Sequence, residues 1–304
     1  MKWLDPDFVA TLEAAGTNAH RISSGRDAWI ERFGTTAVIS VKERALGEVL
    51  ADELDVWTNR AGLSLERIYI RLLVRQPRET DQSVLLRGVP ERPTLEVVRE
   101  EGLLYEVDFG VGYSTGLFCD QRANRRYLRS LVPRRVLNTF AYTCAFSVAA
   151  AKEGAETMSI DLSKSSLARG RRNFELNGLD PSVHRFQAGD VLATLPRLAR
   201  QGSEPFDVII LDPPTFGRSS PRRAFRASRD YEDLIATALD CAAPGAHILL
   251  STNCSTLNAG KLRSMAARVA RGKAAFHQVP AQPDFPVGHG AETLWMQWGK
   301  RGKS

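Results

Sequence analysis

The 304-residue sequence is poor in cysteine and in long apolar runs. It has four cysteines, Cys119, Cys144, Cys241 and Cys254. They show no CxxC spacing and form no metal-type cluster with the five histidines. This pattern speaks against a disulfide framework and against a metal site, and it is typical of a protein of the reducing cytoplasm. No stretch approaches the ~18 apolar residues that span a membrane, so no membrane partner is expected. The acidic N-terminus has no apolar segment behind it and does not resemble a secretory signal.

The sequence also lacks the glycine-rich loops that commonly hold a nucleotide pyrophosphate. No GxxxxGK[ST] motif is present. Glycines do occur in 110–116, but the strand-loop-helix context of a dinucleotide loop is only loosely met and no nearby acid fits. A nucleotide ligand with a pyrophosphate is therefore disfavoured.

The composition is that of a globular protein with an uneven charge. Hydrophobic residues make up 43% of the chain, enough for two domains of ordinary size. The net charge of +6 divides into −5 over residues 1–114 and +11 over residues 115–304. Of the 41 basic residues 33 are arginine, whose planar guanidinium pairs with phosphate and stacks on bases. The second part of the chain thus has a polyanion-binding composition, although an arginine-rich solvated surface would look the same.

Hydrophobic periodicity divides the chain into three regions. Apolar residues at helical spacing over 27–33 and 41–57 predict a helical N-terminal segment, residues 1–60. A strand at 67–74 and a hairpin with strands at 94–100 and 103–109 predict a small α+β domain over residues 61–114. Residues 115–304 alternate between strand and helix patterns in units of about 25–30 residues. This alternation predicts an α/β domain with a doubly wound parallel sheet.

Three consecutive predicted strands of this domain end in an acid, namely Asp161, Asp190 and Asp212. In open α/β sheets, ligands bind outside the carboxyl ends of the strands. A carboxylate at the second strand suits two ribose hydroxyls, and one at the third suits an exocyclic amine such as that of adenine. Because the pyrophosphate loops are missing, the adenosine compound that fits is S-adenosylmethionine.

The sharpest local motif is Asp212-Pro213-Pro214-Thr215-Phe216. Proline fixes φ and removes the backbone donor, so two prolines in succession make a stiff, extended turn. Such a turn can present a carboxylate, a backbone carbonyl and an aromatic face to a planar base. A strand that merely ends at prolines is the simpler alternative.

Six motifs resemble a known family in their order along the chain. They are YSTGLFCDQR (113–122), VLNTFAYTCAFSV (136–148), IDLS (160–163), NFELNGL (173–179), LDPPTF (211–216) and ILLSTNCS (248–255). Over residues ~65 to 298 the chain resembles the class I methyltransferases that modify large-subunit ribosomal RNA, in particular the cytosine-C5 methyltransferase I group. The resemblance implies a Rossmann-like domain with a mostly parallel seven-stranded sheet, preceded by a small α+β domain. The RNA-binding PUA domain usual at the N-terminus of this group is not recognisable in residues 1–60.

The resemblance implies roles for the residues at the strand ends. Phe140, Tyr142 and Thr143 would surround the methionine part of the cofactor, Asp161 would hold the ribose, and Asp190 the adenine amine. Asp212 and Pro213 would form the methyl-transfer face. Gln121 and Arg122 match a segment beside the cofactor carboxylate, for which an arginine is well suited.

One position departs from the family pattern. A glycine usually follows the threonine of the cofactor loop, and this chain has Cys144 there. At a positive φ this cysteine would be strained by ~1–2 kcal/mol. The expectation is therefore either a loop that stays at negative φ or a lowered cofactor affinity.

Cys254 aligns with the cysteine that cytosine-C5 methyltransferases use as nucleophile. Addition of a thiolate to carbon 6 of cytosine activates carbon 5, and Asp212 could hydrogen-bond the base meanwhile. A small buried cysteine at a strand end is the structural alternative. The chain also resembles a guanine-N7 branch of these enzymes, in which no covalent nucleophile is required and Asn253 could contact the base. A methyltransferase of a non-RNA substrate is a third hypothesis.

Basic residues lie directly after the DPPTF motif, as an RNA substrate would require. Arginines here could hold the phosphates beside an extruded nucleotide; those predicted to bind substrate are Arg218, Arg223, Arg226 and Arg229. Pro214 and Phe216 are predicted to contact the nucleobase. Phe225 and Tyr231 could stack on a base or pack the loop on the sheet. The predicted partner is RNA, most simply ribosomal RNA, and a homodimer is left open.

Overall fold

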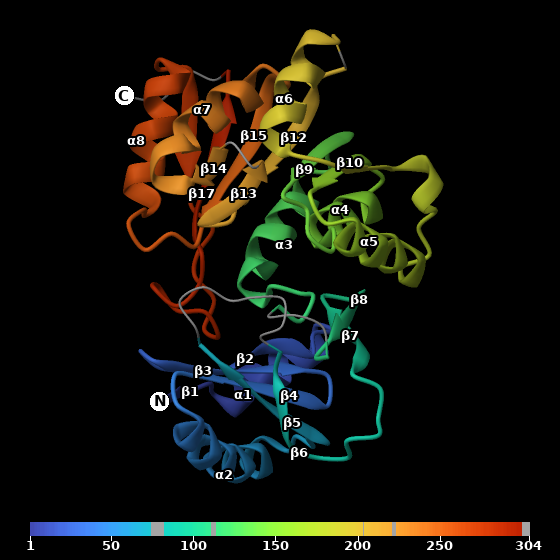
Figure 1. Ribbon diagram of the computed structural model, residues 1–304, viewed down its shortest axis with the longest axis vertical. Helices are drawn as coiled ribbons and strands as arrows, with labels where there is room; N and C mark the ends of the chain where they lie inside the picture. The colour runs from blue at the N-terminus through green and yellow to red at the C-terminus, as the bar shows by residue number, and fades with distance from the viewer. Residues whose placement is uncertain (74–81, 111–113, 203, 221–222, 300–304) are drawn as a thin grey trace. The chain divides into compact units, whose positions relative to one another are not determined.

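The computed structural model describes residues 1–73, 82–110, 114–202, 204–220 and 223–299, and the side chains of 216–220 and 223–225 lie outside this description (Figure 1). The chain forms two compact units. The N-terminal unit comprises Met1–Arg122 and Ala281–His289, and the second unit comprises Ala123–Pro280 and Gly290–Ser304. Each unit is described by itself.

The N-terminal unit is built on a six-stranded sheet of order β1-β2-β3-β4-β5-β6. Its strands are β1 (Lys2–Trp3), β2 (Ala19–Ser24), β3 (Ala28–Phe33), β4 (Thr36–Val41), β5 (Arg67–Leu72) and β6 (Val84–Arg87). Neighbours are antiparallel except β4 and β5, which are parallel because helix α2 (Arg44–Ala61) connects them. Helix α1 (Pro6–Ala14) begins at Asp5, whose side chain accepts a hydrogen bond from the Asp7 amide. One apolar core joins both helices to the sheet and includes Ile22, Ile30, Ile39 and Leu54.

The predicted helical segment over residues 1–60 contains helix α1, but it is wrong over residues 19–41, which form the strands β2, β3 and β4. Residues 27–33 fall in β3, where Ala28 and Ile30 are buried and Trp29 and Glu31 are half-buried. This burial follows the period of two of a strand, and a run of seven residues fits both periods. Pairing with β2 and β4 decides between them. The predicted helix at 41–57 is confirmed as α2, which ends at Gly62 with φ +63°. It crosses the expected border at residue 60.

The predicted hairpin is present in the N-terminal unit. Strands β7 (Leu95–Glu100) and β8 (Leu103–Asp108) pair antiparallel, with Glu100 opposite Leu103. The two turn residues, Glu101 and Gly102, have φ of +50° and +78°. Positive φ at both central positions is the requirement of the hairpin turn whose twist matches that of the strands.

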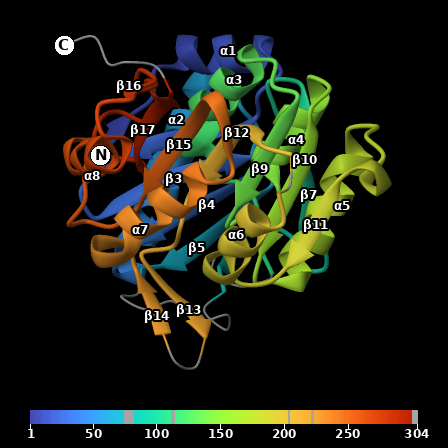
Figure 2. The same ribbon diagram turned by 90° about the horizontal axis from the view of Figure 1, so that it is seen from above.

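The second unit contains the predicted seven-stranded sheet, in the order β11-β10-β9-β12-β15-β17-β16. Six of the seven strands run in the same direction, and β17 is antiparallel to both its neighbours, β15 and β16. The bounds are β9 (Arg135–Thr139), β10 (Glu156–Asp161), β11 (Arg185–Ala188), β12 (Phe206–Leu211), β15 (Ala242–Thr252), β16 (Ala274–His277) and β17 (Glu292–Trp298). This confirms the Rossmann-like α/β fold (Figure 2).

Helices cover both faces of this sheet. One apolar cluster holds the sheet against α6 (Val191–Arg200), α7 (Ala227–Leu239) and α8 (Ala259–Ala270). A second cluster holds the other face against α3 (Arg122–Ser130) and α4 (Ala145–Lys152). Strand β12 contributes side chains to both clusters: Ile209 and Leu211 belong to the first, and Val208 and Ile210 belong to the second. A central parallel strand therefore reads as the continuous apolar run seen in the sequence.

Two features complete the second unit. Helix α5 (Lys164–Leu176) follows β10, with Ser163 as its N-cap. A hairpin of β13 (Phe216–Ser220) and β14 (Arg223–Arg226), not predicted from the sequence, extends from the unit before α7 (Figure 2). Among the helices of the described residues, none is long and apolar enough to cross a membrane.

Candidate active site

The predicted site residues of the second unit gather at the carboxyl edge of its sheet. In the sheet, β9 lies between β10 and β12. From β9 the chain continues to β10 and β11 on one side and then returns to place β12 on the other side. The order thus reverses at β9, and such a switch point opens a crevice above the sheet. The strands β9, β10 and β12 lie side by side in the sheet (Figure 2). Asp161 is the last residue of β10, the loop 140–144 and Asp212 directly follow β9 and β12, and Asn253 and Cys254 follow β15. Their proximity is a consequence of the strand order.

The loop after β9 has an unusual backbone. Phe140, Tyr142 and Cys144 have φ of +54°, +48° and +62°, a region that residues other than glycine rarely enter. Hydrogen bonds hold it there: the Ala141 amide donates to the Ile160 carbonyl at 3.0 Å, and the Asn173 side-chain amide donates to the Thr143 carbonyl at 2.9 Å. These hydrogen bonds fix the loop in its strained conformation. Such concentration of strain is typical of functional sites.

Cys144 therefore takes the strained alternative considered from the sequence. Its thiol is fully buried and lies against α5 at Gly170, where an added Cβ would be only 2.5 Å from Sγ. A glycine in the middle of a helix normally costs stability. Here Gly170 makes the room that the cysteine needs, so the two positions compensate each other.

We expect Gly170→Ala to lower the free energy of unfolding by ~1–3 kcal/mol, because the new methyl group collides with the Cys144 thiol. Adding Cys144→Gly should restore most of that loss, since it removes both the obstacle and the positive-φ strain. Thermal or urea unfolding of the single and double variants measures this coupling. Gly260→Ala in α8, where the nearest atom to the new Cβ is 3.4 Å away, is the matched control and should be near neutral. Additive effects would refute the compensation.

Two backbone amides hold the Asp161 carboxylate, one from the loop after β9 and one from its own chain segment. One carboxylate oxygen accepts the Tyr142 amide and the other the Ser163 amide, each at 2.8 Å. Each oxygen keeps a further lone pair for a ligand hydroxyl. The next residue, Leu162, is an apolar side chain left 54% exposed, which suits the face of a planar ring and was not singled out in the sequence. Asp190 lies two residues beyond β11 and caps α6, accepting the Leu192 amide at 3.0 Å.

The Asp212-Pro213-Pro214 turn leads from β12 into the β13–β14 hairpin. Asp212 is half-buried, Pro213 buried and Pro214 exposed. The side chains of Phe216, Arg218, Arg223 and Phe225 lie outside the described residues, although their backbone forms the hairpin. Arg226 is exposed at the end of β14. Arg229 is also exposed but its guanidinium pairs with Asp230 at 2.7 Å.

Cys254 and Asn253 differ in accessibility. Asn253 is exposed, whereas Cys254 is 8% exposed and packs in the apolar cluster of α7 and α8. The Cys254 thiol lies 3.1 Å from the Thr256 hydroxyl. Burial raises the pKa of the Cys144 thiol to about 12 and that of Cys241 to about 11. These two thiols stay protonated at neutral pH and are excluded as nucleophiles.

Gln121 and Arg122 end the N-terminal unit and are both buried. Arg122 forms an ion pair with Asp284 at 2.7 Å, which the sequence did not predict because 162 positions separate the two residues. The guanidinium atoms Nε and Nη1 have no hydrogen-bond partner among the described residues. Burial acts to lower the pKa of Arg122, but the Asp284 and Glu100 carboxylates outweigh it and raise the value.

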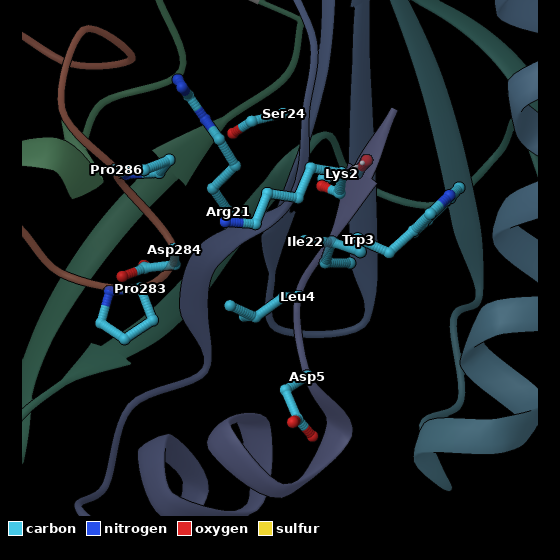
Figure 3. A pocket seen from close by; sticks show the side chains of 11 residues that line it. Lys2, Trp3, Leu4, Asp5, Arg21, Ile22, Ser24, Pro283, Asp284 and Pro286 are labelled. Carbon is cyan, nitrogen blue, oxygen red and sulfur yellow. Dashed lines mark hydrogen bonds between the residues drawn. The ribbon is translucent and has the colours of Figure 1, made fainter.

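The N-terminal unit has a cavity of about 240 Å³ near Asp284, between β1, β2 and residues 283–286 (Figure 3). Arg21 on its wall is tied to the His289 carbonyl and lies over the Phe285 ring at 4.3 Å. None of the predicted site residues lines this cavity. No group of three or more metal-ligating side chains occurs in the part of the chain that the structure describes.

The comparison with known proteins covers the part of the chain that carries the strand-end residues. The model of the S-adenosylmethionine-dependent methyltransferases matches residues 57–296. The chain belongs to this family. It uses S-adenosylmethionine as its cofactor, as the sequence predicted. The residues present fit that group, because Asp161 offers a fixed carboxylate and no phosphate-binding loop is required.

Similar curated proteins cover the methyltransferase region. The chain is 44% identical over 170 residues to ribosomal RNA large subunit methyltransferase I of Aeromonas salmonicida, which is 55% of this chain and 42% of that protein. It is 42% identical over 161 residues to the ribosomal RNA large subunit methyltransferase of Deinococcus radiodurans, 52% and 39% of the two chains. The matched region thus spans less than half the length of these relatives.

Solved structures extend the similarity to the whole chain. SMU.776, crystallised with SAH, superposes with a TM-score of 0.79 at 26% identity over 98% of this chain and 82% of that chain. The SAM-dependent methyltransferase from Agrobacterium tumefaciens reaches a TM-score of 0.72 at 20% identity, over 93% and 90%, which shows the fold alone.

Proposed function

We propose that the chain methylates a base of large-subunit ribosomal RNA, and that the base is cytosine, methylated at carbon 5 through a covalent Cys254 adduct. The observation that carries this proposal is the pairing of β12 with β15, with Leu211 opposite Leu250. Parallel pairing brings Asp212 and the 252–254 segment to the same edge. The Asp212 carboxylate, which can hold a base, and the Cys254 thiol, which can attack it, therefore follow the ends of two adjacent strands. The names of the similar relatives support the RNA substrate.

The cofactor roles follow from the same edge. We propose that Asp161 holds the ribose hydroxyls, that Asp190 receives the adenine amine, and that Phe140, Tyr142 and Thr143 enclose the methionine part. Asp212 and Pro213 border the transferred methyl group. Arg122 is suited to a carboxylate, because its Nε and Nη1 have no hydrogen-bond partner among the residues that the structure describes, and Gln121 precedes it. Bound S-adenosylmethionine supplies an electrophilic methyl group.

The chain's own residues then account for the chemistry. The Cys254 thiolate adds to carbon 6 of cytosine, which makes carbon 5 nucleophilic. Asp212 holds the base during this addition. After carbon 5 is methylated, a base takes the proton from carbon 5. The electron pair left behind re-forms the C5–C6 double bond and breaks the C6–S bond, so the thiolate is released. The Thr256 hydroxyl, 3.1 Å from the sulfur, can donate to the thiolate and stabilise it.

We propose that the β13–β14 hairpin holds the RNA. Pro214 lies between Asp212 and the hairpin, and Phe216 is the first residue of β13; the arginines in the hairpin or just after it are Arg218, Arg223, Arg226 and Arg229. An arginine-rich hairpin next to the base-handling turn suits the phosphates beside an extruded nucleotide. Along the chain, the N-terminal unit precedes the methyltransferase unit, as the PUA domain does in the resembled group. It is therefore a second candidate for binding RNA.

Guanine N7 is the second candidate target. It is favoured by the exposure of Asn253, which can reach a base edge, and by the burial of Cys254. Guanine N7 has its own lone pair and needs no thiolate.

Methyl transfer from tritiated S-adenosylmethionine to naked large-subunit rRNA and to assembled subunits tests the proposal. We expect label in RNA, recovered as 5-methylcytidine after nuclease digestion and chromatography. Recovery as 7-methylguanosine selects the second candidate. Absence of label from every RNA preparation, with label in protein or small molecules of a cell extract, refutes an RNA substrate.

A further inference from the structure

Tyr231 in the second turn of α7 connects the two strands that carry Asp212 and Cys254. Its ring is completely buried, and its hydroxyl lies between the carboxyl ends of β12 and β15. The hydroxyl is 2.9 Å from the Leu211 carbonyl and 2.8 Å from the Ser251 carbonyl, and it accepts the Ser251 amide at 2.9 Å. This burial excludes Tyr231 as a residue that stacks on a base.

The proline turn explains why a side chain is needed at this place. β12 and β15 pair as a parallel ladder up to Leu211 opposite Leu250. Pro213 and Pro214 carry no backbone N–H, so β12 cannot donate to β15 beyond Asp212. Leu211, the last residue of β12, is completely buried, and a buried carbonyl left without a donor is costly. The Tyr231 hydroxyl supplies that donor and accepts the Ser251 amide in return.

The residues beside Tyr231 fix the start of α7. Asp230 is buried, and its carboxylate accepts the Arg226 amide at the end of β14 at 2.9 Å. Burial and the nearby charge of Asp212 raise the pKa of Tyr231 well above its usual value, so the hydroxyl keeps its proton. The first turns of α7 therefore hold the hairpin through Asp230 and the strand ends through Tyr231.

We propose that Tyr231 is a positioning residue, whose hydroxyl sets the spacing between the turn that carries Asp212 and the segment that carries Cys254. This inference rests on the proposed function of these two side chains. Asp212 follows Leu211 directly, and Cys254 lies three residues after Ser251. Both contacts of the hydroxyl are thus within one to three residues of a group that must act on the same base. A displacement of about 1 Å at such groups is enough to cost about 10²-fold in rate.

Tyr231→Phe tests the proposal, because it removes the hydroxyl and keeps the buried ring. We expect kcat for methyl transfer to fall by about 10- to 100-fold, with the KM for RNA and the Kd for S-adenosylmethionine within about threefold of wild type. We also expect faster amide hydrogen exchange in peptides that cover 207–211 and 248–254. Tyr127→Phe in the same unit is the matched control. Its hydroxyl lies 3.5 Å from His247 Nδ1, away from both strand ends, and neither readout should change.

The outcomes separate the two claims. Unchanged hydrogen exchange at both strand ends overturns the claim that the Tyr231 hydroxyl holds the ends of β12 and β15 together, whatever the activity. Faster exchange with wild-type kcat overturns the positioning role. Equal losses for Tyr231→Phe and Tyr127→Phe would show a general loss of packing and would also overturn it. If the wild-type protein methylates no RNA, the proposed function fails. Hydrogen exchange alone then decides whether the Tyr231 hydroxyl holds the two strand ends together.

Discussion

Cys254→Ala is expected to reduce methyl transfer to cytosine by at least about 10³-fold, because carbon 5 stays unreactive without thiolate addition at carbon 6. The loss should appear in kcat, with the cofactor Kd unchanged. Because Cys254 packs in the core beside Leu257, some stability is lost as well, so unfolding is measured on the same sample.

Cys241→Ala is the matched control for this variant. Cys241 is also a small buried thiol, immediately before β15, and its raised pKa of about 11 keeps it protonated. Its loss should leave kcat within about threefold of wild type, because Cys241 lies at the amino ends of β12 and β15, where its carbonyl accepts the Phe206 amide.

A trapping experiment tests the covalent step directly. RNA with 5-fluorocytidine at the target cannot lose a proton from carbon 5, so the thiolate cannot be expelled after methylation. Wild-type protein should then remain joined to the RNA on a denaturing gel, and Cys254→Ala should not. Full activity of Cys254→Ala would exclude the cytosine route and leave guanine N7.

Asp161→Ala is expected to weaken binding of the cofactor or of SAH by about 100-fold. The side chain accepts two backbone amides and, in the proposed complex, two ribose hydroxyls; charged hydrogen bonds of this kind contribute about 1.5–3 kcal/mol each. Removing it also frees the Tyr142 amide, so the strained loop loses one of the bonds that holds it. Titration calorimetry with SAH measures the change.

Asp207→Ala separates cofactor binding from loss of backbone support. Asp207 on β12 accepts the amides of Arg134 and Arg135 at 3.0 and 2.9 Å, at the opposite end of the sheet from Asp161. Both variants should lose stability by a similar amount, and only Asp161→Ala should lose affinity. If the two variants bind SAH alike, Asp161 does not hold the cofactor.

The parallel sheet and its ligand edge could be predicted from the sequence because their signals are local. A strand buried on both faces must be apolar throughout, as 206–211 is, and an acid directly after it is visible without a structure. The helix starts were also readable, since the N-cap of α5 is a serine that bonds the Ser166 amide. The resemblance added the roles of these residues.

The residues that the sequence analysis missed depend on distant contacts. Gly170 was not singled out in the sequence, and only the position of the Cys144 thiol explains a glycine in the middle of this helix. Tyr231 left stacking and packing equally open until its hydroxyl was located between two strand ends. The β3 strand was mistaken for helix because seven residues satisfy both periods, and the choice rests on hydrogen bonds to its neighbours.

The sequence by itself determined the α/β class of the second unit, the acids at its strand ends and the cofactor. Alternating patterns, prolines and terminal acids act within a few residues, so they are legible in order along the chain. The tertiary structure decided the six-stranded N-terminal sheet, the positive φ of Cys144, the pairing of Arg122 with Asp284 and the place of Tyr231. Each of these depends on groups that are brought together only when the chain folds, and burial then makes an unpaired group or a clash too costly to leave.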